Sequence, residues 1–537
     1  MPNNINITDM SQDPTGQSRP GTLQDRPCAA VPDIVDEKHT YREILKSSAL
    51  IGGSSLLSVV IGIVRTKAFA LLLGPTGVGL MGLYGLIADI ARIIAEMGIN
   101  SSGVRQIADA VGSGDTERIA RTITVLRRTT IFLGILGAVL LVVLSKPVST
   151  LTFGNDQHAG AVALLSLAVL FRLVADSQGA LIQGMRRISD LAKMGVLGAL
   201  LGTIVSIPVI YFLGEAGVAL SLVCVAALSV ITSWWYSRKV QVSRPVMALS
   251  QITTEAASLL KLGFAFMASG FLMMGAAYVV RVMLLNNVGL EAAGLYQSAW
   301  TLGGLYVGFV LQAMGADFYP RLVGVAADNP QCNRLVNEQA HISLLLAGPG
   351  VIATLTFAPL VIALFYSAKF EAAVDILRWI CLGMALRVIT WPMGFIIVAK
   401  NKQAIFIGAE LAWTIVSVGL AWIYIGSFGL NGASMAFFGS YVFHGLMIYP
   451  IVRRLSGFRW SVANRTTGLL FFSLITAVFC GFYLFPPYIA TGIGISAIIC
   501  AGFYSIRVLV NLVSSEGIPL PIRRLLVILH FAPATSK

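Results

Sequence analysis

Charged residues are scarce in this sequence. Asp, Glu, Lys and Arg together make up 12% of its 537 residues, whereas about 25% is usual in a soluble globular protein. Apolar residues make up 56%, and the mean hydropathy is +0.80. A water-soluble core cannot accommodate so many apolar side chains, so the composition excludes an ordinary soluble protein.

The sequence also lacks a metal or redox motif built from cysteine. No CxxC or Cys/His ligand spacing occurs among its six cysteines, which are Cys28, Cys224, Cys332, Cys381, Cys480 and Cys500. We therefore expect no cofactor and no metal. Residues 1–40 are polar and lack the apolar stretch of a signal peptide, which predicts a disordered tail.

Long apolar runs are what the sequence does have. Four clear ones cover residues 49–64, 131–144, 196–213 and 469–485, close to the roughly 20 residues that a helix needs to cross a bilayer. These runs are continuous, whereas the strands of a membrane barrel need alternating segments. We predict an all-α integral membrane protein with about fourteen transmembrane helices, which start near residues 45, 77, 126, 159, 190, 215, 257, 291, 338, 372, 403, 428, 464 and 487.

Basic residues indicate how these spans are oriented. With the N-terminus inside, Lys and Arg gather in the even-numbered connections, as in Arg186-Arg187, and the odd ones hold little beyond Lys146 and Lys369. This bias predicts that both termini lie in the cytoplasm. The net charge of +13 is spread over the connections, so we expect no nucleic-acid partner.

The outer connections are short. Several are tight turns such as Leu73–Gly77 and Pro486-Pro487. They leave no room for an external catalytic domain, so we predict that the protein is not an enzyme and acts within the membrane.

A weak internal repeat divides the chain. Arg65 precedes Gly82-Leu83-Tyr84, and Arg281 precedes Gly294-Leu295-Tyr296 six spans later. Because six is even, the two halves have the same orientation and are related by an axis along the membrane normal. We predict two six-helix lobes, at residues 41–240 and 257–455, which face each other across a central cavity and are joined by a cytoplasmic linker at 241–256. Two additional helices follow at residues 456–515, and cytoplasmic tails lie at residues 1–40 and 516–537.

Many charged residues fall inside the predicted spans. Each costs about 2.5 to 3.5 kcal/mol at the centre of a helix, so it usually faces a cavity or a partner. Opposite charges three or four residues apart, as in Arg172 and Asp176, share a helix face and can neutralise each other. One interpretation is that these charged residues are structural ion pairs or snorkel from helix ends. The other is that they line a cavity or take part in coupling, and the candidates for this role are Asp89, Arg92, Arg172, Asp176, Asp317 and Glu410.

Three arginines have no acid three or four residues away in their own spans, namely Arg65, Arg281 and Arg387. Each needs a partner from another helix, a hydrated cavity or an anionic ligand. A guanidinium binds phosphate through paired hydrogen bonds and stays charged at any working pH. We expect these three residues to line a cationic cavity that binds a phosphate-bearing substrate.

Two other residues favour packing roles. His444 has no carboxylate nearby in its own segment, which is typical of a core histidine. Trp391 lies near an apparent helix end, which is typical of an interface anchor, although stacking on a sugar ring stays open.

Five segments are distinctive in combination: LLLGPTGVGLMGLYGLI at 71–87, GINSSGVRQIAD at 98–109, FYPRL at 318–322, FYSAKFEAAVDILRW at 365–379 and VAKNKQAIFIGAEL at 398–411. Through them, residues 45–455 resemble the Wzx-type polysaccharide translocases. These are the flippases of O-antigen (part of lipopolysaccharide) and enterobacterial common antigen, in the MOP superfamily with the MATE exporters and the lipid II flippase MurJ.

The resemblance implies two six-helix bundles around a cationic cavity that opens alternately to each side. It implies transport of an undecaprenyl-pyrophosphate-linked oligosaccharide from the cytoplasmic to the periplasmic leaflet of the bacterial inner membrane, for O-antigen, common antigen or exopolysaccharide biosynthesis. The partners to expect are this lipid-linked oligosaccharide, membrane lipids, and a polysaccharide polymerase with its chain-length regulator. We expect a monomer.

The chain departs from the family's pattern in two places. Many members have twelve spans, so the pair at 464–514 is either a lipid contact or an addition. Some relatives carry an acid just before the basic residue that matches Arg387, whereas Gly383-Met384-Ala385-Leu386 precedes it here. Proton coupling through that acid is therefore not expected.

Two other functions stay open as alternatives. A MATE-like exporter of cationic drugs would need an acid-lined cavity, and the first span contains no Asp or Glu after Glu43. A membrane glycan polymerase or ligase would need a large external loop with catalytic residues, which the short outer connections do not provide.

Overall fold

The computed structural model describes residues 34–113, 115–240, 245 and 247–512. The chain forms two units, Met1–Ser48 and Ala49–Lys537. Of the first unit, residues 34–48 are described, and they form the start of a helix. The packing reported below concerns the second unit. Most of the predicted N-terminal tail, the predicted C-terminal tail and part of the predicted linker lie outside the described residues.

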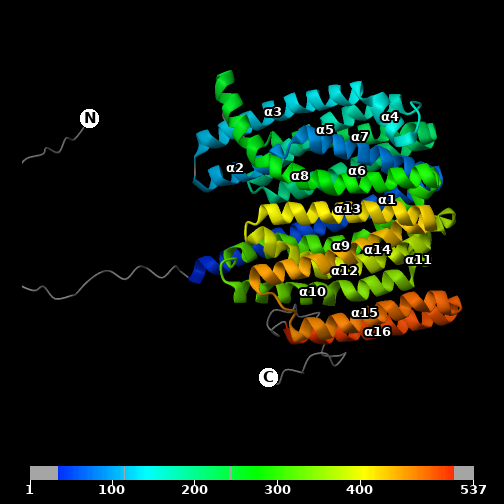
Figure 1. Cartoon of the computed structure of the whole chain (residues 1–537). Helices are drawn as coiled ribbons and strands as arrows, with labels where there is room; N and C mark the ends of the chain where they lie inside the picture. Colours follow the sequence, from blue (N-terminus) through cyan, green and yellow to red (C-terminus); the bar gives the residue numbers. More distant parts are fainter. Residues whose placement is uncertain (1–33, 114, 241–244, 246, 513–537) are drawn as a thin grey trace, which may run out of the picture. The chain divides into compact units, whose positions relative to one another are not determined.

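Every regular element in the described part of the chain is a helix (Figure 1), which confirms the all-α prediction. The first group comprises α1 (Ile34–Glu96), α2 (Ile99–Ser113), α3 (Thr116–Val143), α4 (Ser145–Phe153), α5 (Ala159–Gly184), α6 (Ile188–Leu213) and α7 (Gly217–Ser237). The second comprises α8 (Leu249–Asn287), α9 (Leu290–Gly324), α10 (Asn329–Thr356), α11 (Ala358–Phe365), α12 (Ala373–Ala399), α13 (Gln403–Phe428) and α14 (Leu430–Ser456). The chain continues with α15 (Val462–Leu484) and α16 (Pro487–Leu512).

Eleven helical stretches in the described residues are long and apolar enough to span a membrane. Two of these are double. In α1, Gly74 has a φ of 68° and precedes Pro75, which lacks a backbone N–H, so the helix breaks there. In Ile188–Ser237, the 3-10 turn Gly214–Ala216 separates α6 from α7. Each span start predicted from the sequence falls in or next to a described helix.

Most helices pack against near neighbours in the sequence. In the first group, α5 packs against α3 and α7, and α7 packs against α6. In the second group, α12 packs against α9, α10 and α14, while α13 packs against α14 and α8. Helix α8 also contacts α2 and α3. The division into two six-helix lobes stays a prediction.

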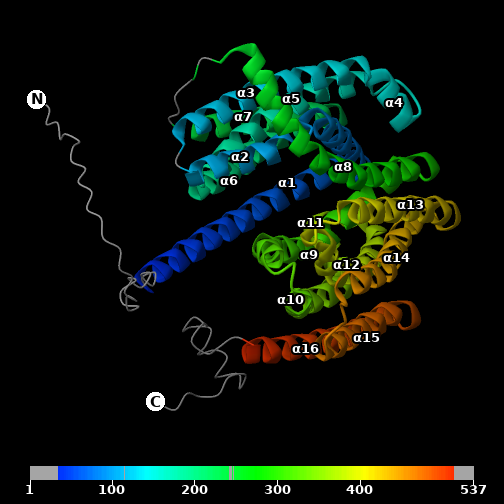
Figure 2. The same ribbon diagram turned by 60° about the vertical axis from the view of Figure 1, so that its left-hand side comes forward.

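The last two helices pack against each other and against α10 (Figure 2). The ring of Phe471 in α15 lies directly over Gly348 of α10. In addition, the guanidinium of Arg378 in α12 lies 3.8 Å from the ring centre of Phe482 in α15. Stacking of this kind stabilises the contact between helices, so α15 is attached to α10 and α12 through specific side chains.

Close glycine contacts join the second part of α1 to α8 and α9. A Cβ atom on Gly294 of α9 would collide with the carbonyl oxygen of Pro75, and one on Gly79 would lie 2.5 Å from that of Leu290. Just beyond the C-terminal end of α1, a Cβ atom on Gly98 would collide with the carbonyl oxygen of Gly263 in α8. About 26 Å of helix lies between Gly79 and Glu96, so the second part of α1 meets the second group near both of its ends.

We expect Gly294→Leu to lower the thermal stability of the protein, because a side chain there must push α1 and α9 apart. Overpacking of this kind typically costs about 1 to 3 kcal/mol. The measurement is the midpoint of thermal unfolding in detergent. The matched control is Gly419→Leu in α13, where an added Cβ meets nothing within 4 Å. Equal midpoints for the two variants would contradict the contact.

Candidate functional site

Five charged side chains form a bonded group between α1 and α5. Arg92 of α1 lies 2.6 Å from Glu96 and 3.3 Å from Asp176 of α5. Arg172 of α5 lies 2.8 Å from Asp89, which is also 3.9 Å from Arg92. The ion pairs therefore cross between the two helices, and Arg172 and Asp176, which the sequence paired with each other, each bind a residue of α1.

The charges of α5 are only partly covered by protein. The side chains of Arg172 and Asp176 are 48% and 46% exposed, although both lie in the membrane-spanning stretch Ala159–Gly184. Charged groups at this depth face protein or water because hydrocarbon cannot solvate them. The exposed part of these two side chains therefore needs a polar partner such as water.

Arg65 of α1 lies close to the same group. The guanidinium of Arg172 is close enough to interact electrostatically with that of Arg65. The Nη1 atom of Arg65 lies beside Gly202 of α6. The five bonded side chains, called the N-terminal charge group below, carry two positive and three negative charges when all are ionised, and the nearby Arg65 brings the sum to zero. This N-terminal charge group can therefore hold its positive charges inside the membrane at a moderate cost in free energy.

Arg281 of α8 is held by neutral groups. It is 4% exposed, its Nε donates to Gln297 Oε1 at 2.8 Å, and its Nη1 donates to the Ala277 carbonyl at 3.0 Å. The guanidinium carbon lies 5.4 Å and 5.6 Å from the ring centres of Tyr296 and Trp300. Since none of these partners is an acid, the positive charge of Arg281 is uncompensated among the described residues.

Arg387 of α12 lines a cavity of about 250 Å³ together with Glu410 of α13 and with Tyr441 and His444 of α14. The positive charge of Arg387 interacts electrostatically with Tyr441 and with His444, and the negative charge of Glu410 interacts electrostatically with Tyr441. Within the described part of the chain, the side chains of Arg387 and Glu410 form no ion pair or hydrogen bond. This cavity, called the α12–α14 cavity below, therefore contains one basic and one acidic group that do not bind each other.

The structure places the three candidate arginines in different surroundings. Arg65 lies near the N-terminal charge group, Arg281 lies between α8 and α9, and Arg387 lies in the α12–α14 cavity. Each of the cavities and bonded groups described above contains at most one of them. The side chain of Asp317 lies outside the described residues. A joint site formed by the three arginines therefore stays a hypothesis.

Some participants were missed from the sequence. Gln297, the partner of Arg281, lies 16 residues away on another helix, and no local pattern connects the two. Trp391, which favoured an interface role, lines the α12–α14 cavity. His444, which favoured a core role, keeps a buried Nδ1 without a hydrogen-bond partner in the described structure. The Arg92–Glu96 bond, in contrast, has the four-residue spacing that predicts such a pair from the sequence.

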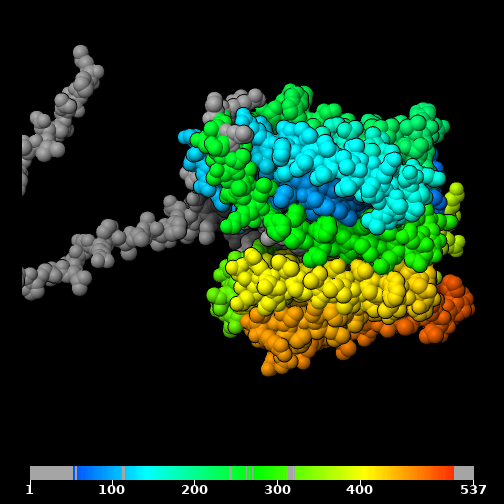
Figure 3. All heavy atoms as spheres, turned by 45° about the horizontal axis from the view of Figure 1, so that its top comes forward, coloured from blue at the N-terminus to red at the C-terminus, as the bar shows by residue number. Residues whose placement is uncertain are grey.

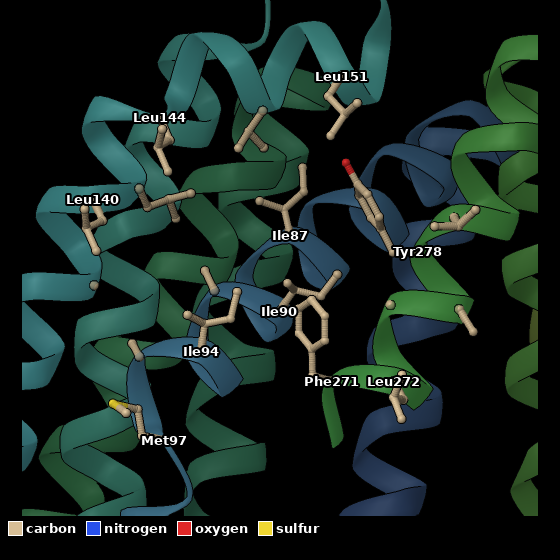
Figure 4. A pocket seen from close by; sticks show the side chains of 18 of the residues that line it. Ile87, Ile90, Ile94, Met97, Leu140, Leu144, Leu151, Phe271, Leu272 and Tyr278 are labelled. Atoms are coloured by element: carbon tan, nitrogen blue, oxygen red, sulfur yellow. The ribbon is translucent and has the colours of Figure 1, made fainter. Parts of the chain in front are cut away.

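An apolar groove of about 710 Å³ lies among α1, α3, α4, α8 and α13. In Figure 3 it opens between α3 and α4 (cyan) and α8 (green), with α1 (blue) at its floor. Figure 4 shows side chains of α1, α3 and α8 that surround this space, among them Ile87, Ile90, Ile94, Leu140, Leu144, Phe271 and Tyr278. Asp89 and Arg92 flank Ile90 and Ala91 in the sequence, so the groove and the N-terminal charge group use adjacent faces of α1.

Comparison with known proteins identifies the family of this chain and proteins that have a similar sequence or fold. Residues 68–375 match the family described as polysaccharide biosynthesis protein. The Lipid III flippase of Escherichia coli (strain K12) is 22% identical over 405 residues, which cover 74% of this chain and 95% of that protein.

Solved structures with the same fold have low sequence identity. The lipid II flippase MurJ in its inward closed conformation has a TM-score of 0.63 at 13% identity, covering 86% of this chain and 99% of that one. An inward-facing multidrug resistance MATE transporter of the MOP superfamily has a TM-score of 0.62 at 16% identity, covering 74% of this chain and 95% of that one. These findings confirm the resemblance seen in the sequence. With more than half of its residues matched, the chain belongs to the polysaccharide biosynthesis protein family and has the fold of the MATE and MurJ transporters.

Proposed function

We propose that the protein is a flippase, which moves a lipid-linked oligosaccharide from the cytoplasmic to the periplasmic leaflet of the bacterial inner membrane by alternating access. The observation that carries this proposal is the presence of arginines inside membrane-spanning helices, two of which, Arg281 and Arg387, have no acidic partner among the described residues. Such groups attract an anionic headgroup into the bundle. The family and the similarity to the two flippases support the same function.

The transport step needs no covalent chemistry, and the relatives are transporters and not enzymes. The protein must keep pyrophosphate charge and sugar hydroxyls away from hydrocarbon while its helices change between two states. Arg65, Arg281 and Arg387 are suited to pyrophosphate because a guanidinium offers paired donors and a permanent charge. Since they lie in different surroundings, we propose that the headgroup meets them in successive states of the cycle.

The polyprenyl chain needs an apolar path beside the headgroup. The groove between α1, α3 and α8 offers one, and it shares α1 with the N-terminal charge group. A lipid whose chain lies in the groove would have its headgroup next to the charged face of the same helix. Since acids and arginines balance on that face, this arrangement suits an amphiphile with an apolar chain and a polar head.

The topology and the partners are part of the same proposal. The distribution of Lys and Arg supports a cytoplasmic location for both termini. With this orientation, the short outer connections face the periplasm. A polysaccharide polymerase and its chain-length regulator would then receive the flipped substrate there, and the transporter itself would act as a monomer.

A cation exporter is the weaker candidate. Its cavity would need carboxylates free to bind a cation. In the N-terminal charge group, Asp89, Glu96 and Asp176 each lie next to an arginine. Glu410 is free of such a pair, yet it shares its cavity with the cationic Arg387. These surroundings favour an anionic substrate.

Leaflet exchange in proteoliposomes tests the function. We expect the wild type to exchange a fluorescent undecaprenyl-pyrophosphate oligosaccharide, and we expect Arg281→Ala and Arg387→Ala to be at least about tenfold slower. A hydrogen bond to a charged group is worth about 1.5 to 3 kcal/mol, which corresponds to tenfold or more. Arg65→Ala should slow exchange in the same direction.

The control for this experiment is Arg334→Ala, since Arg334 is 81% exposed and bound to Glu338 outside any cavity. Monodisperse elution of every variant would show that it folds. Wild-type exchange rates in the alanine variants of Arg65, Arg281 and Arg387 would refute the headgroup role, and absence of exchange by the wild type with several glycans would refute the flippase.

The charge pairs of α1 and α5 give a second test. We expect Arg172→Asp to reduce the yield of folded protein, because Asp89 would then face a second carboxylate at short distance. The double variant Arg172→Asp with Asp89→Arg restores an opposite pair and should recover the yield. The measurement is the folded fraction by fluorescence-detected gel filtration. A double variant as poor as the single one would show that the loss of yield does not come from the interaction between positions 172 and 89, and a single variant with wild-type yield would show that the pair is not needed for folding.

A further inference from the structure

The α12–α14 cavity has a composition that differs from the apolar groove. Aromatic side chains that pack in pairs line the cavity. The ring centres of Trp391 and Phe395, both in α12, lie 4.6 Å apart in an edge-to-face arrangement, and those of Trp413 in α13 and Tyr441 in α14 lie 5.8 Å apart. Thr390, Glu410 and His444 add hydroxyl, carboxylate and imidazole groups. This mixture of rings and hydrogen-bonding groups is suited to a ligand with both an apolar face and hydroxyls.

Several polar groups in this cavity have unused hydrogen-bonding capacity. The Trp413 Nε1–H donor and the His444 Nδ1 atom are buried and have no partner in the described structure. The Glu410 carboxylate likewise forms no hydrogen bond or ion pair there. Buried polar groups in proteins are nearly always bonded. A ligand that brings hydroxyl groups would supply partners when these side chains turn toward it.

Size and charge narrow the choice of ligand. At about 250 Å³ the cavity is smaller than the 300–1,000 Å³ usual for drug-sized ligands, so it suits a single ring. Arg387 and Val398, which both line the cavity, lie about 16 Å apart along α12. A ring bound beside Arg387 would have its anionic substituent next to that guanidinium.

From this geometry we propose that the cavity binds the first sugar ring of the substrate, the one attached directly to the pyrophosphate. Trp391 and Trp413 provide faces for the ring, Glu410 accepts hydrogen bonds from its hydroxyls, and Arg387 contacts the adjoining phosphate. The inference rests on the proposed flippase function. It assigns sugar recognition to the C-terminal helices α12, α13 and α14, separately from the N-terminal charge group.

The test compares two probes that differ in one sugar. Purified protein in detergent is titrated with undecaprenyl pyrophosphate, and with the same lipid carrying glucose, galactose or N-acetylglucosamine. We expect the wild type to bind at least one sugar-bearing lipid about tenfold more tightly than the bare lipid. Trp413→Leu and Glu410→Gln should abolish this difference and leave the affinity for the bare lipid within about twofold.

The matched control is Trp422→Leu on the same helix, because the side chain of Trp422 is 70% exposed on the outside of the protein. It should retain wild-type preference for the sugar. Variants that keep the full preference, or that lose affinity for both lipids equally, would overturn the sugar site, as would a wild type without any preference. A wild type that binds neither lipid would instead overturn the proposed function.

Discussion

The structure depends on one constraint: inside a bilayer, every charge and every backbone polar group must find its partner within the protein or in a hydrated cavity. Helices satisfy the backbone. The charges are satisfied in pairs, as between Arg92 and Glu96 or Arg172 and Asp89. Where an arginine has only neutral partners, as Arg281 has in Gln297 and the Ala277 carbonyl, its uncompensated charge becomes available to an anion.

Helix α1 brings three different environments together. Through Gly79 it meets the backbone of α9, its residues Asp89 and Arg92 bind α5, and Ile90 and Ala91 line the apolar groove. Because an α-helix has 3.6 residues per turn, neighbouring residues of α1 point in different directions and lie on different faces. An amphiphilic substrate therefore finds a charged surface and an apolar one on a single helix, and a movement of α1 relative to α9 would affect both.

The charged groups in the two parts of the chain differ in kind. In the first part, acids and arginines balance, so that group can remain in the membrane without a ligand. In the second part, Arg387 and Glu410 line one cavity without binding each other, beside Trp413 and His444. Recognition of a neutral, hydroxyl-rich ligand beside an anion fits the second arrangement better than the first.

The helical membrane fold, the starts of the spans and the three arginines without a local acidic partner could be predicted from the amino-acid sequence, because hydrophobicity, Gly/Pro breaks and i+4 spacing are local properties. The family could be predicted from five segments that resemble its members. Which charges meet depends on how the helices pack. Arg172 binds Asp89 across helices, Arg281 binds Gln297, and Arg387 shares a cavity with Glu410. Such partners are set by how helices rotate and cross, which depends on close contacts such as Gly79 with Gly294 that no single segment encodes.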